Sequence, residues 1–258
     1  MTHQANQNVF FRIETGTHSA PIESLLPLAG QSRLLTAGRD KTVRVWDLEG
    51  HRLERTLLWQ IGPGRVGEFV RMAWRFGRQE LFVVTRNVEG DVAYAPWGPV
   101  SHSSASYGSE PLSATLRIFD LQTGNQRIAQ AGLGWISTLC YSLSLDAIVV
   151  VDSVSRQLRL FDVEALLLPD ARPRLTCEPL AGEPRRLAVI ERDAQPRLVV
   201  GAWGEAGAVT LHDIEPQGFA LRRKLDLPDG DRAGRIAVGT RHLAIAGLYQ
   251  PRVYLYDF

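Results

Sequence analysis

Apolar and polar residues alternate in five short segments of the chain, and all five segments share one ending. Each segment places Val, Ile or Leu at every second position and closes on a ring-bearing residue followed by aspartate, as in TVRVWDL at residues 42–48. Such alternation predicts half-buried β-strands. The other four endings are residues 115–121, 157–163, 208–214 and 252–258. We therefore expect one strand in each of five related units.

Further strands are predicted around each ending. A short run rich in Val, Ile and Leu precedes each ending across a turn, which is typical of a strand buried on both faces. These runs are residues 33–38, 80–85, 147–152, 197–202 and 242–247, and an additional strand is expected before each, at 22–28, 69–74, 136–141, 186–190 and 235–238. A last strand follows four of the endings, at 52–58, 126–129, 174–179 and 220–225. Repeated units of four antiparallel strands predict an all-β protein with the architecture of a β-propeller.

Unequal spacing of the endings indicates an insertion in the second unit. The ring-bearing residues are separated by 73, 42, 51 and 44 residues, and they are Trp46, Phe119, Phe161, His212 and Tyr256. Residues 89–114 are rich in Gly, Pro and Ser and account for the long first interval. We expect this insertion to be a loop between the second and third strands of blade two. A second excursion, at residues 165–173, is expected on the opposite face, with one helical turn that proline ends.

The first unit also holds a polar constellation. His18 is followed by Thr36, Asp40 and Trp46, and Trp46 is followed by Asp47. In order and spacing these residues resemble the WD-repeat (WD40) family, which takes its name from such a Trp-Asp pair. The resemblance implies a β-propeller and a structural hydrogen-bond chain from the indole through the hydroxyl and imidazole to the carboxylate. A nucleophile triad uses the same groups, but no strand-to-helix nucleophile elbow accompanies them.

The two ends of the chain are expected to meet in the last blade. The fifth unit stops at Phe258 after its third strand, whereas residues 9–15 (VFFRIET) are predicted as an isolated strand ahead of the first unit. The resemblance implies that such an N-terminal strand completes the last blade, which leaves no open sheet edge. We therefore expect a single domain of five blades over residues 1–258. The alternative is a longer protein, in which these residues form one regulatory domain beside an effector or enzymatic domain.

Alignment of the five innermost strands brings three arginines to one equivalent position. The residues at this position are Ser24, Arg71, Thr138, Arg186 and Arg235. Guanidinium groups that converge at the mouth of the central channel attract phosphate, carboxylate or an acidic peptide. The alternative is that these arginines pair with neighbouring acids such as Glu68 and Glu183, or stack on aromatic side chains of the next blade.

The aromatic residues of the insertion are the other candidates for partner binding. They lie among glycines and serines, and exposed aromatic side chains on an adaptable loop suit a binding surface. These residues are Tyr94, Trp97, His102 and Tyr107. The alternative is that the insertion only folds over the top face of the propeller.

Composition argues against several classes of partner. Lys and Arg number 29 against 28 Asp and Glu, so no overall charge draws the chain to nucleic acid. The run Arg222-Arg223-Lys224 is expected on a solvated outer strand. No signal-peptide pattern occurs, and no apolar run approaches the ~18 residues that span a bilayer, so we expect a soluble cytoplasmic protein without a membrane partner. The two cysteines, Cys140 and Cys177, form no CxxC motif and are expected to be buried thiols.

No sequence motif indicates catalysis, a cofactor or a metal site. The six histidines contain no HExxH pattern, no Walker motif occurs, and GPGRVG at residues 62–67 lies between strands. The enzymatic alternative is a propeller glycosidase with acids near the axis, for which the candidates are Glu68, Asp152 and Glu205. We therefore expect a non-catalytic interaction scaffold or sensor module, without a cofactor, that binds protein or peptide partners through one face.

Overall fold

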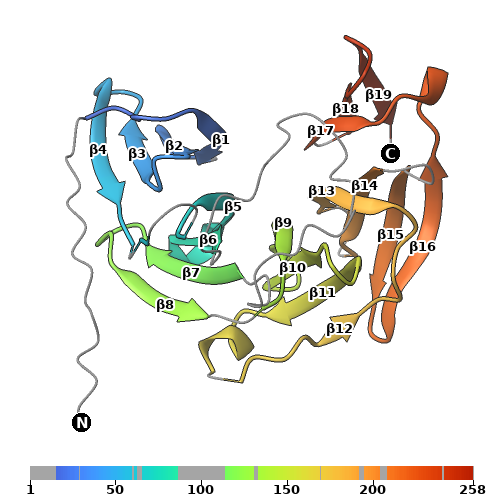
Figure 1. The fold of residues 1–258 in the computed structure, drawn as a ribbon, viewed down its shortest axis with the longest axis horizontal. Coiled ribbons are helices and arrows are strands. Elements are labelled where there is room, and N and C mark those ends of the chain that lie inside the picture. The colour runs from blue at the N-terminus through green and yellow to red at the C-terminus, as the bar shows by residue number, and fades with distance from the viewer. Residues whose placement is uncertain are drawn as a thin grey trace.

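The described part of the chain forms five antiparallel sheets of consecutive strands around a common axis (Figure 1). The structure, a computed structural model, describes residues 16–28, 30–59, 61–62, 66–86, 114–130, 133–168, 170–191, 195–203, 208–239 and 241–257. We number the sheets blades 1 to 5 in chain order. The prediction of an all-β, five-bladed propeller is confirmed. In these described ranges no helix has the length and apolar character needed to cross a membrane.

The first four blades contain four strands each. Blade 1 consists of β1 (Ile22–Leu28), β2 (Arg33–Gly38), β3 (Val43–Asp47) and β4 (Arg52–Leu57). Blade 2 consists of β5 (Phe69–Arg75), β6 (Glu80–Arg86), β7 (Ala114–Asp120) and β8 (Gln126–Gln130). Blade 3 consists of β9 (Ile136–Ser142), β10 (Ala147–Asp152), β11 (Gln157–Asp162) and β12 (Leu175–Thr176). Blade 4 consists of β13 (Glu183–Ile190), β14 (Arg197–Trp203), β15 (Val209–Glu215) and β16 (Gly218–Leu225).

Blade 5 contains three strands within the described residues, namely β17 (Ala233–Val238), β18 (His242–Gly247) and β19 (Val253–Asp257). Its fourth strand is expected from residues 9–15, which lie outside the described residues, so this pairing stays a prediction. Three short 3₁₀ turns complete the elements: η1 (Phe76–Arg78), η2 (Ala165–Leu167) and η3 (Pro228–Gly230). The turn η2 is the helical turn expected at 165–173.

Blade 3 differs from the prediction in its outer strand. The sequence pattern predicted a strand over residues 174–179, but β12 is limited to Leu175–Thr176. Prolines stand on both sides, at Pro173 and Pro179. Proline has no N–H to donate at these two positions. The backbone bonds that continue past the strand, from Cys177 to the Leu158 carbonyl and from Leu180 to the Arg156 carbonyl, are irregularly spaced, so the regular ladder is short.

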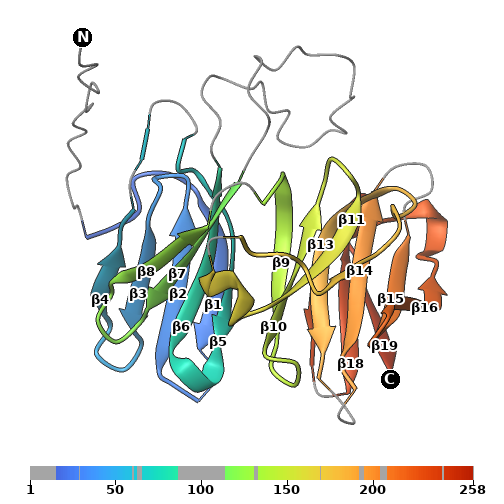
Figure 2. The ribbon, with the colours of Figure 1, turned by 90° about the horizontal axis from the view of Figure 1, so that it is seen from below.

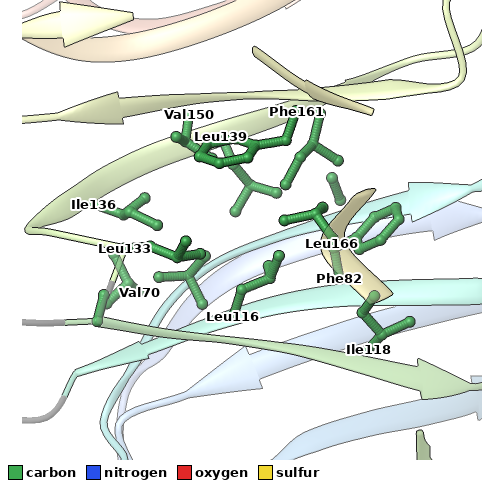
Figure 3. Packing of buried hydrophobic residues seen from close by; sticks show 14 of the residues in the cluster. Val70, Phe82, Leu116, Ile118, Leu133, Ile136, Leu139, Val150, Phe161 and Leu166 are labelled. Atoms are coloured by element: carbon green, nitrogen blue, oxygen red, sulfur yellow. The ribbon is translucent and has the colours of Figure 1, made fainter. Parts of the chain in front are cut away.

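Each blade packs through two apolar faces because side chains alternate along its strands. We call the side turned to the next blade the forward face and the side turned to the preceding blade the back face. The forward face of blade 2 packs on the back face of blade 3 (Figure 3). The residues in this contact include Phe82, Leu116 and Ile118 from blade 2 and Leu139, Val150 and Phe161 from blade 3. Three further contacts of the same kind join the other neighbouring blades.

Polar contacts join the turns between the first and second strands of successive blades. These turns lie along the lower edge of the molecule in Figure 2. Each contact links one blade to the next, so blades 1 to 4 are tied in a row. The pairs are Gln31–Gln79 (3.0 Å), Arg75–Asp146 (2.7 Å) and Ser144–Glu191 (2.7 Å).

The contact between blades 2 and 3 is built around the buried Arg75. Its guanidinium donates to Glu80 in its own blade (Nη1–Oε2 2.7 Å) and to Asp146 of blade 3. The hydroxyl of Tyr141 donates to the same carboxylate (2.8 Å). Burial alone would raise the pKa of Asp146, but the hydrogen bonds from Arg75 and Tyr141 outweigh it and hold this pKa below its ordinary value. Burial, together with the bond to Asp146, raises the pKa of Tyr141 to about 12.

The core between blades 2 and 3 predicts a large effect for one phenylalanine. Phe82 is 0% exposed, whereas Phe76 is 50% exposed. Phe82→Ala removes a buried ring and leaves a cavity, so we expect it to lower the free energy of unfolding by about 3–5 kcal/mol in urea titrations. Phe76→Ala is the matched control, with an expected loss of about 1 kcal/mol from its edge contact with Trp74. Equal losses in the two variants would contradict this packing.

The lowered pKa of Asp146 predicts a pH-dependent contribution to stability. A group whose folded pKa is depressed stabilises the fold above its unfolded pKa, about 3.9 for aspartate, and loses this effect as pH falls through the folded pKa. We expect wild type to be more stable than Asp146→Asn at neutral pH, with the difference shrinking below about pH 4. Asp170→Asn, at an exposed position, is the control. A difference between Asp146→Asn and wild type that stays constant in urea titrations from neutral to acidic pH would be evidence against the prediction.

Candidate functional site

The four polar residues predicted in blade 1 lie in one hydrogen-bonded chain. Trp46 on β3 donates its indole N–H to Thr36 Oγ1 on β2 at 2.8 Å. Thr36 Oγ1 lies 2.7 Å from His18 Nε2, and His18 Nδ1 lies 2.9 Å from Asp40 Oδ2. The side chains of His18 and Asp40 are each 4% exposed. These hydrogen bonds thus join β2 and β3, the turn between them and the segment before β1.

The donors and acceptors available in this series of hydrogen bonds determine which atoms carry the protons. A carboxylate only accepts, so His18 Nδ1 carries the proton and Nε2 accepts from the Thr36 hydroxyl. The carboxylate of Asp40 also accepts from the Thr42 hydroxyl (2.8 Å) and from the backbone N–H of Ser19 (3.2 Å). The Thr36 oxygen is therefore engaged on both sides, as acceptor from Trp46 and donor to His18. We interpret the set as a structural staple of blade 1.

A β-bulge occurs at the same place in all five innermost strands. In each strand the register against its neighbour skips one residue. The residue that follows the skipped one is, in chain order, Ser24, Arg71, Thr138, Arg186 and Arg235. The three arginines therefore occupy one equivalent position on the strands nearest the axis (Figure 1).

The three arginines share one local contact. Nη1 of each donates to the carbonyl oxygen of the skipped residue directly before it, Val70 (2.8 Å), Arg185 (3.0 Å) or Gly234 (3.1 Å). Nε of Arg186 also donates to the Gly234 carbonyl of blade 5 at 2.6 Å. Arg71 and Arg186 are half-buried and Arg235 is exposed. The bulge thus orients each guanidinium group in the same way.

Each of the acids considered as partners for these arginines has a contact with another arginine. Glu68 lies 3.7 Å from Arg86, and Glu183 pairs with Arg185. The guanidinium carbon of Arg186 lies 5.5 Å from the ring centre of Trp203, which belongs to the same blade and not to the next one. Arg186 therefore lies beside an aromatic ring, as the alternative expected, but the ring belongs to its own blade.

Sequence reasoning missed two tryptophans that contact arginines, Trp135 and Trp203. Arg86 stacks on Trp135 of the next blade at 5.1 Å, and Arg185 lies 5.6 Å from Trp203. The indole of Trp203 donates to the Ala233 carbonyl of blade 5 at 3.0 Å. Their positions in the sequence could have indicated these tryptophans, because Trp135 stands directly before β9 and Trp203 ends β14.

Several other predicted site residues fall outside the described residues. These are Tyr94, Trp97, His102 and Tyr107 of the insertion, and Glu205. Of the other acids considered for glycosidase chemistry, Asp152 pairs with Arg159 at 2.8 Å. Among the described residues, no group of three or more His, Cys, Asp and Glu side chains is placed to hold a metal ion. Cys140 and Cys177 are free thiols, and burial raises the pKa of both.

Comparison with known proteins supports the fold. No family model matches the chain, and no curated protein matches it. The crystal structure of the Cps50 (Swd1) β-propeller domain from Myceliophteria thermophila is similar, with a TM-score of 0.58 and 12% sequence identity. The similarity covers 95% of this chain and 86% of that one. At this identity it establishes the β-propeller fold alone.

The hydrogen-bond chain of blade 1 predicts a stability loss when its central hydroxyl is removed. Thr36→Val keeps the volume but leaves the indole N–H of Trp46 and the imidazole of His18 without their common partner. We expect a loss of about 1–3 kcal/mol in the free energy of unfolding. Thr176→Val, at an exposed position of β12, is the control and should stay within about 0.5 kcal/mol of wild type. If Thr36→Val had the same free energy of unfolding as wild type in urea titrations, the stabilising role of this hydrogen-bond chain would be wrong.

Proposed function

We propose that this protein is a non-catalytic interaction platform that binds an acidic protein segment at the mouth of its central channel. The observation that carries the proposal is the shared placement of Arg71, Arg186 and Arg235 directly after the bulges of three innermost strands. Side chains at one equivalent position of a circular repeat present their charges at one level around the axis. A segment with several carboxylates matches such a set.

The contacts of the three arginines support recognition of carboxylates. The bond from Nη1 to the bulge carbonyl orients each of the three guanidinium groups in the same way. The planar guanidinium matches the two oxygens of a carboxylate, and such charge-assisted bonds are about twice as strong as neutral ones. Fixed orientation also reduces the side-chain entropy lost on binding.

The scaffold supports display of loops in fixed positions. Packed blades hold the strand ends that border the mouth, so a partner meets a surface that needs little ordering. The insertion at 89–114 leaves blade 2 after β6 and returns at β7, and we include its Tyr94, Trp97, His102 and Tyr107 in the proposed binding surface. We also propose a cytoplasmic protein without cofactor, nucleic-acid or membrane partner, and the balanced charge of the chain supports this for nucleic acid.

Loss of two axial arginines should weaken binding of an acidic peptide. In fluorescence anisotropy with a labelled glutamate-rich peptide, Arg71→Gln combined with Arg235→Gln is expected to weaken binding at least about tenfold. Arg222→Gln combined with Arg223→Gln makes the same charge change on the outer strand β16, and its effect should stay within about twofold. Equal losses in both double variants, or no binding by wild type, would show that the mouth is not an acidic-peptide site.

A further inference from the structure

The forward face of blade 5 has the composition of a covered face but is exposed. On the third strand of every blade two aliphatic residues point forward, and in blade 5 these are Val253 and Leu255. The equivalent pairs in blades 1 to 4 are 0–7% exposed, whereas Val253 and Leu255 are 65% and 68% exposed. The four covered pairs are Val43 and Val45, Leu116 and Ile118, Leu158 and Leu160, and Val209 and Leu211. Blade 5 thus repeats a packing surface that nothing in the described structure covers.

A hydrogen-bond donor accompanies this face. At the contact between blades 4 and 5, Nε of Arg186 donates to the Gly234 carbonyl, which belongs to the bulge residue of the following blade. Arg235 occupies the equivalent position of blade 5, is exposed, and donates to the carbonyl of its own Gly234. A sheet placed against blade 5 in the same way brings its own bulge carbonyl to Arg235.

The back face of blade 1 is the counterpart at the other end of the row. Leu25 on β1 is 62% exposed, whereas the equivalent Met72 and Leu139 are 8% and 5% exposed. Successive innermost strands pack together, β1 with β5, β5 with β9, β9 with β13 and β13 with β17. Within the described residues, β1 and β17 form no contact of similar extent, and blades 1 and 5 are the two ends of the row in Figure 1.

Neither the chain's own blade 1 nor a second copy fits the exposed face. Four close-packed contacts set the angle between successive blades, and such contacts do not deform continuously. In Figure 1 blade 1 lies at the other end of the row from blade 5. A second copy docked in the same geometry continues around the same axis, so its later blades run into blade 1 of the first copy. A short sheet adds one more layer to the row, whereas a second copy adds five.

We propose that the forward face of blade 5 binds a short β-sheet segment of a partner protein, which packs on it as an additional blade. The segment presents aliphatic or aromatic residues at alternate positions to Val253 and Leu255, and a backbone carbonyl to Arg235. This surface goes beyond the proposed acidic-peptide site, with which it shares Arg235 alone, because it is centred on Val253 and Leu255.

A hairpin of this chain serves as the probe. The strands β5 and β6 cover the forward face of blade 1 through Met72, Leu81 and Val83. A synthetic peptide of residues 68–86 is titrated into the full chain by isothermal calorimetry. We expect binding to wild type, and Leu255→Gln should weaken it at least about tenfold. Leu221→Gln is the matched control, because Leu221 is 62% exposed on β16 and lies outside the surface, and it should bind as wild type does.

The remaining outcomes overturn the proposal. The proposal is wrong if Leu255→Gln binds the peptide as tightly as wild type does. It is also wrong if wild type does not bind the peptide at millimolar concentration. Self-association of wild type in sedimentation experiments that Leu255→Gln abolishes assigns the face to a second copy instead. The acidic-peptide titration should be identical for wild type and Leu255→Gln, so failure of this proposal is distinguishable from failure of the proposed function.

Discussion

Packing of one blade's forward face on the next blade's back face is the constraint on which this structure depends. A single twisted sheet exposes two apolar faces, and it becomes stable only when other layers cover them. Burying one large side chain such as Phe82 or Phe161 contributes roughly 1.5–3 kcal/mol, whereas an exposed ion pair contributes about 1 kcal/mol or less. The apolar contacts therefore hold the blades together. Polar pairs such as Gln31–Gln79 and Ser144–Glu191 favour one relative orientation of neighbouring blades.

The same constraint places chemistry at the axis. Face-to-face packing turns the first strand of each blade inward, and a bulge at one position gives every such strand the same local bend. Residues separated by a full repeat, such as Arg186 and Arg235, then reach equivalent places without any contact between them being required. The proposed binding surface at the channel mouth thus depends on the repetition of one strand position, and the residue that each repeat has there determines its charge.

Much of this architecture could be predicted because strand formation and blade repetition are local properties. The alternation around Trp46, Phe119 and Tyr256 marks the third strands, and the resemblance to the WD-repeat family implied the hydrogen bond between His18 and Thr36. The length of β12 was mispredicted because the apolar pattern does not report the irregular backbone hydrogen bonding between Pro173 and Leu180. Contacts between blades could not be predicted, since Arg75 and Asp146 are 71 positions apart and meet only when two sheets pack. The exposed state of Leu255 is equally invisible in sequence, because its segment resembles four buried ones.

The arrangement of the blades in a row also has a consequence for local unfolding. In a stack of repeats each unit is stabilised by its own contacts and by those with its nearest neighbours, so end units open before central ones. Blade 1 is an end unit, and the hydrogen bonds that link Trp46 to Asp40 connect its strands internally. Blade 5 is packed on one side, through Leu243 and Ile245, within the described residues. We therefore expect local opening to begin in blade 5, at β18 and β19, before it reaches blade 1.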